Sequence, residues 1–210
     1  MLKVLLVDDH ELIRAGLSQV LQGGFGKMQI GEARNAQEAM SLLQQQQWDL
    51  AITDITLPGR SGLDLLFEFK NLRPNMPVLV LSVLSEDEIA VRVLKSGAAG
   101  FVHKETSGED LVKAARKVLA GGKYVSQSLA EKLAMQIGNP LTDDPHKKLS
   151  DREYLVMTML ASGKTLTQIA RTLSLSIKTI STYRSRIMQK MRLDNNAELT
   201  RYALKHGLVE

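Results

Sequence analysis

Five polar side chains, each following a short apolar run, have the clearest chemical potential in the chain. They are Asp8, Asp9, Asp54, Ser82 and Lys104. Three carboxylates brought together repel one another, so they either raise a pKa or recruit a cation. Oxygen ligands without His or Cys favour a hard ion, and a shell completed by water suits Mg²⁺. The set therefore predicts a magnesium site if the fold gathers these side chains.

Asp54 is the candidate nucleophile. Its carboxylate could attack a phosphoryl group while the metal and Lys104 neutralise the equatorial oxygens and Ser82 donates a hydrogen bond. Each residue taken singly has a plainer interpretation. Asp54 could be a solvated loop aspartate, and Asp8 and Asp9 could cap the helix that follows them. Only joint placement at one edge distinguishes a site from these alternatives.

The first 122 residues predict the scaffold that this chemistry needs, because strand-length apolar runs alternate with helical stretches. Strands are expected at Lys3–Val7, Met28–Ala33, Leu50–Thr53, Pro77–Ser82 and Gly100–His103. Helices are expected at Glu11–Leu21, Ala36–Gln46, Leu63–Leu72, Glu86–Lys95 and Glu109–Leu119. The alternation is typical of an α/β fold, a doubly wound (βα)5 parallel sheet. With strand order 2-1-3-4-5, strands one and three are neighbours at the switch point, where such sheets bind ligands.

Composition sets wider limits. The chain has 210 residues, 44% of them hydrophobic, which suffices for one large domain or two small ones. It has no Cys, so disulfides and thiolate metal sites are excluded, and a cytoplasmic location is expected. Apolar runs of strand length predict no membrane span, and a strand pattern at the N-terminus leaves no room for a signal peptide.

Charge divides the chain into two parts. Residues 1–122 carry 13 Lys or Arg against 15 Asp or Glu, whereas residues 146–206 carry 12 against 4. This asymmetry predicts different partners for the two parts. Between them, Ser128–Ile137 is expected to form a short helix, and Gly138–Lys148 a flexible boundary. The expected domains are 1–122, a helix and linker at 123–148, and 149–210.

From Leu149 onward the pattern is helical. Ser150 with Glu153 predicts a capping box. A short helix at Leu166–Leu173, a tight turn and a longer helix at Ile177–Leu193 indicate a helix-turn-helix. The polar face of the longer helix could be plain solvated surface, but the basic charge favours DNA, with Lys and Arg on phosphates and residues near the helix start on bases. The expected DNA contacts are Lys178, Ser181, Thr182, Arg184, Ser185, Arg186 and Lys190.

Two sets of motifs resemble known families. The first is Val-Asp-Asp, Asp54 with Pro58, Ser82, and Lys104 after Gly-Phe-Val-His. Residues 1–122 thereby resemble the CheY-like receiver domain of bacterial two-component response regulators. The second set includes Leu-Ser-Asp-Arg-Glu, Leu-Ser-Ile-Lys-Thr-Ile-Ser and His-Gly-Leu. It makes residues 149–208 similar to the DNA-binding domain of NarL/FixJ (LuxR-type) regulators, and most similar to their GacA/UvrY branch.

These resemblances imply a transcriptional regulator controlled by phosphorylation. Asp54 would accept a phosphoryl group from a sensor histidine kinase. Asp8 and Asp9 would form the acidic pair, with Asp9, Asp54 and the Thr56 carbonyl reaching Mg²⁺. The phosphorylated protein would be a homodimer on double-stranded DNA, and RNA polymerase is a candidate partner.

The receiver resemblance also implies how the signal is read and how long it lasts. Ser82 and Phe101 would be the switch pair, and Phe101 lacks the hydroxyl of the commoner tyrosine. Thr56 and Leu84 would flank the path of the hydrolytic water. Leu84 cannot orient that water, so slow loss of phosphate is expected.

Two rival functions are left open by the sequence. One is a small aspartate-nucleophile phosphohydrolase, which needs a substrate pocket and an acid or base near the nucleophile. The other is a DNA-binding module that ignores phosphorylation. In the regulator, a flexible linker transmits no rigid motion, so the two parts must communicate by docking or dimerisation. We expect the receiver to mask the recognition helix or the last helix, whose Leu199, Ala203 and Leu204 would form a dimer stripe.

Overall fold

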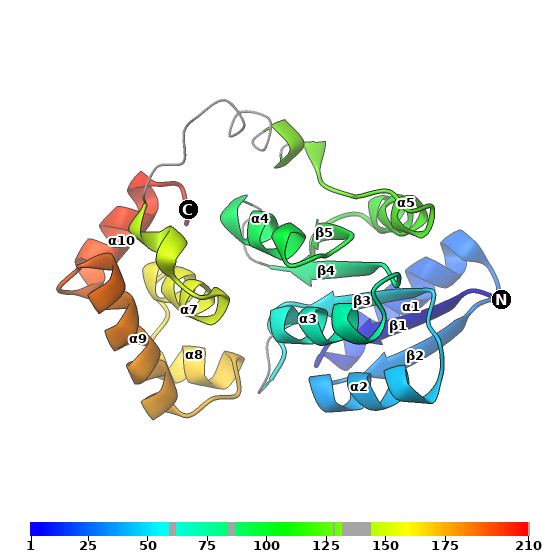
Figure 1. Cartoon of the computed structure of the whole chain (residues 1–210), viewed down its shortest axis with the longest axis horizontal. Helices are drawn as coiled ribbons and strands as arrows, with labels where there is room; N and C mark the ends of the chain where they lie inside the picture. Colours follow the sequence, from blue (N-terminus) through cyan, green and yellow to red (C-terminus); the bar gives the residue numbers. More distant parts are fainter. Residues whose placement is uncertain (59–61, 84–86, 128, 132–143, 210) are drawn as a thin grey trace.

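The computed structural model describes residues 1–58, 62–83, 87–127, 129–131 and 144–209. Within them, a parallel sheet with its helices forms one unit and a group of helices forms a second (Figure 1). The strands are β1 (Lys3–Val7), β2 (Gln29–Ala33), β3 (Leu50–Asp54), β4 (Val78–Ser82) and β5 (Gly100–His103). The order β2-β1-β3-β4-β5 confirms the predicted topology.

Helices cover both faces of the sheet because alternate strand residues point to opposite sides. The helices are α1 (Glu11–Phe25), α2 (Ala36–Gln45), α3 (Gly62–Leu72), α4 (Asp87–Lys95) and α5 (Gly108–Leu119). In β1, Val4 and Leu6 pack in one core cluster with residues of α1 and α5. Leu5 and Val7 belong to the cluster that contains residues of α2, α3 and α4. β3 and β4 are buried throughout, which explains their continuous apolar runs.

The predicted end of the first helix is wrong. We expected the helix to end at Leu21, before the Gly23-Gly24 pair, but α1 continues to Phe25 and ends at Gly26, whose φ is +75°. A Cβ on Gly24 would lie 2.6 Å from Val112 in α5, so this glycine allows two helices to approach closely. Close packing thus outweighs the poor helix propensity of glycine.

The second unit packs around a single buried helix, Asp151–Ala161. Its elements are the 3₁₀ helix η1 (Pro145–Lys148), α7 (Asp151–Ala161), α8 (Leu166–Thr172), α9 (Ile177–Met191) and α10 (Asn196–Lys205). Ser150 and Glu153 form the predicted capping box at the start of α7. Leu199 and Ala203 are buried in this core, so the predicted dimer stripe on the last helix is wrong.

The segment between the units is only partly described. Most of the predicted helix Ser128–Ile137, and residues 138–143 of the predicted boundary, lie outside the described residues. Tyr124 pairs with Gly100 beside β5. At the other end, η1 is an ordered 3₁₀ turn with His146 buried, where a flexible boundary was expected. No helix in the described part of the chain is long and apolar enough to cross a membrane.

Candidate functional site

Asp8, Asp54, Ser82 and Lys104 meet at the carboxyl edge of the sheet. Asp8 follows β1, Asp54 and Ser82 end β3 and β4, and Lys104 follows β5. The Lys104 Nζ atom lies 2.6 Å from Asp8 Oδ2 and 2.8 Å from Asp54 Oδ2. Asp8, Asp54 and Ser82 are fully buried. The structure therefore brings together side chains that lie almost 100 residues apart in the sequence.

Charge pairing sets the electrostatics of this group. Burial alone lowers the pKa of Lys104, but the carboxylates of Asp54 and Asp8 outweigh it, so the pKa lies above its usual value. Lys104 is therefore a permanent cation near neutral pH. One ammonium contacts two buried carboxylates, which leaves local negative charge for a further cation.

Asp54 is held by the residues that follow it. The Thr56 N–H donates to Asp54 Oδ1 at 3.1 Å, and the Thr56 hydroxyl donates to Oδ2 at 2.8 Å. The N–H of Gly62 donates to the Ile55 carbonyl, which brings the start of α3 against the strand end. A Cβ on Gly62 would lie 2.0 Å from the Asp54 carbonyl oxygen, so only glycine fits there.

Asp8, Asp9 and His10 form a cluster that fits a cation. A ligand atom from each of the three lies within 4.8 Å of the other two. His10 Nδ1 lies 3.1 Å from Asp8 Oδ1 and 3.0 Å from Asp9 Oδ1. The carboxylate oxygens of Asp8 and Asp9 suit a hard divalent ion such as Mg²⁺, and Asp8 shares the Lys104 ammonium with Asp54. His10 is not among the residues predicted for this site, because no second imidazole lies at ligand spacing from it in the sequence and a surface histidine was expected.

Phe101 and Ser82, the expected switch pair, lie on neighbouring strands of the sheet. Phe101 is buried on β5 and packs in the same core cluster as Ala90 and Val93 of α4. Ser82 lies on the neighbouring strand, where its register partner is His103. β5, which carries Phe101, thus packs beside α4. Leu84 lies outside the described residues.

Helix α9 presents the residues expected to contact DNA. All of them are exposed except Arg184, which is half-buried. Lys178 and Arg186 project from this face, whereas the hydroxyls of Thr182 and Ser185 donate to carbonyls one turn back in the helix. The spacing of Ile177, Ile180 and Ile187 predicts that all three point inward; Ile180 and Ile187 are buried, but Ile177 is half exposed.

Two basic residues of α9 are engaged within their own domain. Arg184 Nε donates to Asn196 Oδ1 at 2.7 Å. Lys190 Nζ lies 2.6 Å from the Oε2 atom of Glu153, which is buried in α7. Burial alone raises the pKa of Glu153, but Lys190 and Ser150 lower it more, and the net pKa falls below its usual value. Lys190 therefore supports the fold as well as the basic surface.

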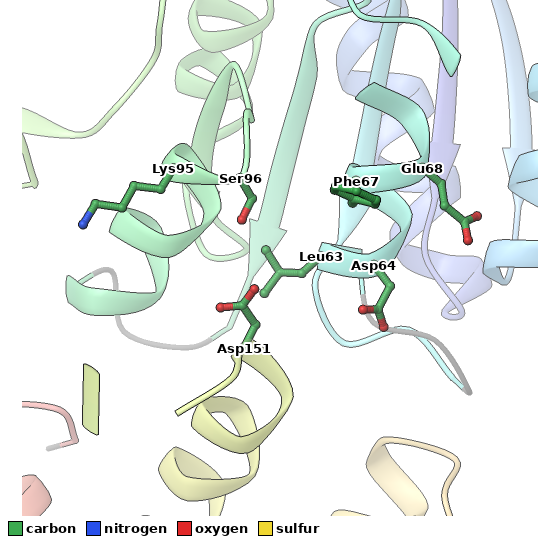
Figure 2. Close-up of a pocket in the computed structure, with 7 residues that line it drawn as sticks. All are labelled: Leu63, Asp64, Phe67, Glu68, Lys95, Ser96 and Asp151. Atoms are coloured by element: carbon green, nitrogen blue, oxygen red, sulfur yellow. The ribbon is translucent and has the colours of Figure 1, made fainter. Parts of the chain in front are cut away.

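An arginine of α4 joins the two units. Arg92 Nη1 donates to the Leu149 carbonyl at 2.8 Å and to Asp151 Oδ1 at 3.1 Å, and Nη2 donates to the His146 carbonyl at 2.9 Å. Its guanidinium also lies 4.4 Å from the centre of the Tyr154 ring. Beside this contact, a pocket opens between α3, the end of α4 and the start of α7 (Figure 2).

The receiver-like unit docks on α7 and η1 and leaves the outer face of α9 exposed (Figure 1). The prediction that the receiver masks the recognition helix or the last helix is thus wrong for this arrangement, because Arg201, Leu204 and Lys205 of α10 are exposed as well. The role of Arg92 could not be predicted from the sequence, because its partners lie more than 50 residues away and depend on how the two units dock.

The fold and the site together define a receiver domain joined to a helix-turn-helix. Comparison with family models agrees. Residues 4–116 match the response regulator receiver domain, and residues 147–203 match the luxR family of bacterial regulatory proteins. The chain therefore belongs to the response regulators with a LuxR-type DNA-binding domain. It is a phosphorylation-controlled transcriptional regulator rather than an enzyme, which sets aside the phosphohydrolase alternative.

Full-length relatives support this assignment. The chain is 35% identical over 211 residues to the response regulator GacA of Pseudomonas aeruginosa, covering 100% of this chain and 99% of the relative. It is 34% identical over 209 residues to the response regulator UvrY of Escherichia coli K12, covering 99% and 96%. Among solved structures, RcsB of Salmonella enterica serovar Typhimurium, bound to promoter rprA in the presence of phosphomimetic BeF3⁻, has a TM-score of 0.67 at 28% identity, covering 96% and 97%.

Proposed function

We propose that Asp54 is the phosphoacceptor and that a sensor histidine kinase is the donor. The observation that carries this proposal is the Lys104 ammonium, which contacts Asp54 and Asp8 at the buried sheet edge. A carboxylate oxygen of Asp54 attacks the phosphorus atom, and the bond from phosphorus to the donor nitrogen breaks as the new P–O bond forms.

The surrounding residues serve this transfer. Lys104 stabilises charge on the phosphoryl oxygens, and Ser82 lies where it can bind one of them. Asp8, Asp9, Asp54 and the Thr56 carbonyl would hold Mg²⁺, which supplies further charge neutralisation. The Thr56 hydroxyl now bonds to Asp54 Oδ2, so it must turn away if that oxygen is the one phosphorylated.

The DNA interface is proposed to be the outer face of α9. Exposed Lys178 and Arg186 contact phosphates, and Ser181, Thr182 and Ser185 face the bases. Arg184 and Lys190 contribute positive charge from positions fixed by Asn196 and Glu153. The similarity to RcsB, solved on promoter DNA, supports this orientation. The phosphorylated protein is proposed to bind as a homodimer, with RNA polymerase a candidate partner.

The signal is proposed to leave the site through Ser82, Phe101 and α4. Phe101 packs in the same core cluster as α4, and Arg92 of α4 holds the DNA-binding unit. A shift of α4 on phosphorylation would weaken the Arg92 contacts and release that unit for dimerisation. This route needs no rigid linker.

The phosphoacceptor is tested by measuring intact mass after incubation with a small phosphodonor and Mg²⁺. Wild type should gain one phosphoryl group, and a chelator should prevent the gain. Asp54→Asn should gain none, whereas Asp110→Asn, which changes an aspartate of α5 whose side chain is 44% exposed, should behave like wild type. Full labelling of Asp54→Asn would overturn the assignment.

A further inference from the structure

A second cluster of metal-ligating side chains lies outside the receiver site, where the start of the DNA-binding unit meets its end. Asp144, His146 and His206 each place a ligand atom within 4.8 Å of the other two. Asp144 precedes η1, His146 lies within it, and His206 follows α10. The chain has four histidines, so half of them meet at this point.

The environment orients both imidazole rings. His146 is only 1% exposed, and its Nδ1 atom lies 2.7 Å from the Tyr202 hydroxyl. The Tyr202 ring stacks on His206, with ring centroids 4.2 Å apart. One tyrosine therefore fixes the position of two potential ligands. Histidine ligands in metal sites commonly hold their second ring nitrogen in a hydrogen bond, and the Tyr202 hydroxyl can supply such a bond here.

Two imidazoles and a carboxylate suit a borderline ion rather than Mg²⁺, and three protein ligands leave a fourth position for water. Around Zn²⁺, with bonds of about 2.0–2.2 Å, tetrahedral donor atoms lie roughly 3.3 Å apart. The donors present, within 4.8 Å of one another, would need to approach by up to about 1.5 Å. His206 is exposed and Asp144 half-buried, so both can make this movement.

We propose that Asp144, His146 and His206 bind Zn²⁺ or a similar divalent transition-metal ion, with His146 Nε2 as one ligand atom and Tyr202 as its positioning residue. The metal would tie η1 to the end of α10. The His146 carbonyl accepts a hydrogen bond from Arg92. The metal would therefore also restrict the movement of η1, the segment that Arg92 of the receiver binds.

One competing interaction is already present. Lys147 Nζ lies 3.0 Å from Asp144 Oδ2. Lys147 is 41% exposed, and ion pairs of this kind contribute little, so a metal ion can displace it. The proposal therefore does not require Asp144 to be unpaired beforehand.

The test uses the full-length protein in excess Mg²⁺, titrated with Zn²⁺ against a chromogenic chelator. Wild type should bind one Zn²⁺ that His206→Ala and Asp144→Asn lose or bind at least about tenfold more weakly. Tyr202→Phe should weaken this site by about 10–100-fold without removing a ligand. His103→Ala is the matched control and should retain wild-type binding, because His103 lies outside the cluster.

The result that overturns the proposal is equally specific. If His206→Ala and wild type bind the same number of Zn²⁺ ions with the same affinity, the bound zinc belongs to the Asp8, Asp9 and His10 cluster instead. His206→Asp replaces one ligand by another and should restore part of the lost affinity. Failure of this rescue, in a variant whose circular dichroism matches wild type, would also contradict metal ligation.

Discussion

At the residue scale, buried charges in this protein are tolerated where a partner of opposite charge is fixed nearby. Lys104 contacts Asp8 and Asp54, and Lys190 contacts Glu153. A buried charge whose partner is removed is strongly destabilising, so these pairs constrain which substitutions the fold accepts. Only the first group has a place in the chemistry; the second holds α9 against α7.

The pair of Glu153 and Lys190 makes the DNA-binding unit sensitive to acid. Glu153 has a lowered folded-state pKa, so its stabilisation is present above the unfolded pKa of about 4.3 and is lost as the pH falls through the folded value. Glu153→Gln should cost roughly 1–2 kcal/mol at neutral pH. The difference from wild type should shrink below about pH 4.3.

Urea unfolding followed by circular dichroism at several pH values measures this effect. Glu105→Gln, at a highly exposed position in the receiver, is the control and should show no comparable loss. A destabilisation of Glu153→Gln that stays the same at low pH would mean that packing or capping, rather than charge, accounts for it.

At the element scale, the strands could be predicted well because their ends fix where side chains emerge. A parallel sheet places every carboxyl end at one edge, so Asp54 and Lys104 could be brought together from the sequence alone. Helix faces were harder to predict. Leu199 and Ala203 have the spacing of an interface stripe, but the same spacing serves an internal core, and the pattern carries no information on which partner covers it.

The two adjacent glycines of α1 offer a matched comparison. Nothing lies within 4 Å of a Cβ on Gly23, so Gly23→Ala should stabilise the protein by about 0.5–1 kcal/mol through helix propensity. Gly24→Ala should lose this gain, because its Cβ would meet Val112 at 2.6 Å. The urea concentrations at the midpoints of unfolding measure the stabilities of both variants. Equal stabilisation would show that α1 and α5 separate easily.

Helix α9 should bind phosphates through Arg186. Arg186→Ala should reduce the slope of log affinity against log salt by about 0.9 and weaken binding to specific and random DNA alike. Mobility shifts at several salt concentrations measure the slope. If Arg186→Ala instead alters base preference at one position and leaves the slope unchanged, then Arg186 contacts a base.

At the scale of the whole molecule, the arrangement of the two units could not be predicted from the sequence. It depends on Arg92, whose carbonyl partners, His146 within η1 and Leu149 between η1 and α7, come together only when the second unit has folded. Neither periodicity nor charge marks one arginine of α4 as a link between domains.

Removing this link should separate the units. Arg92→Ala loses three hydrogen bonds and the contact with Tyr154, so the unphosphorylated protein should show a larger radius of gyration in small-angle scattering. Arg92→Lys keeps the charge without the forked donor geometry and should be intermediate. Arg116→Ala, on the α5 face, is the control. An unchanged radius in Arg92→Ala would show that other contacts hold the units together.

The central claim is that phosphorylation of Asp54 controls DNA binding by α9. The most direct measurement is the affinity of full-length protein for its operator, with and without a small phosphodonor, at one salt concentration. Wild type should gain at least about tenfold, equivalent to roughly 1.4 kcal/mol, and Asp54→Asn should gain nothing. Equal affinity of wild type in the two conditions, or the same gain in Asp54→Asn, would contradict the claim.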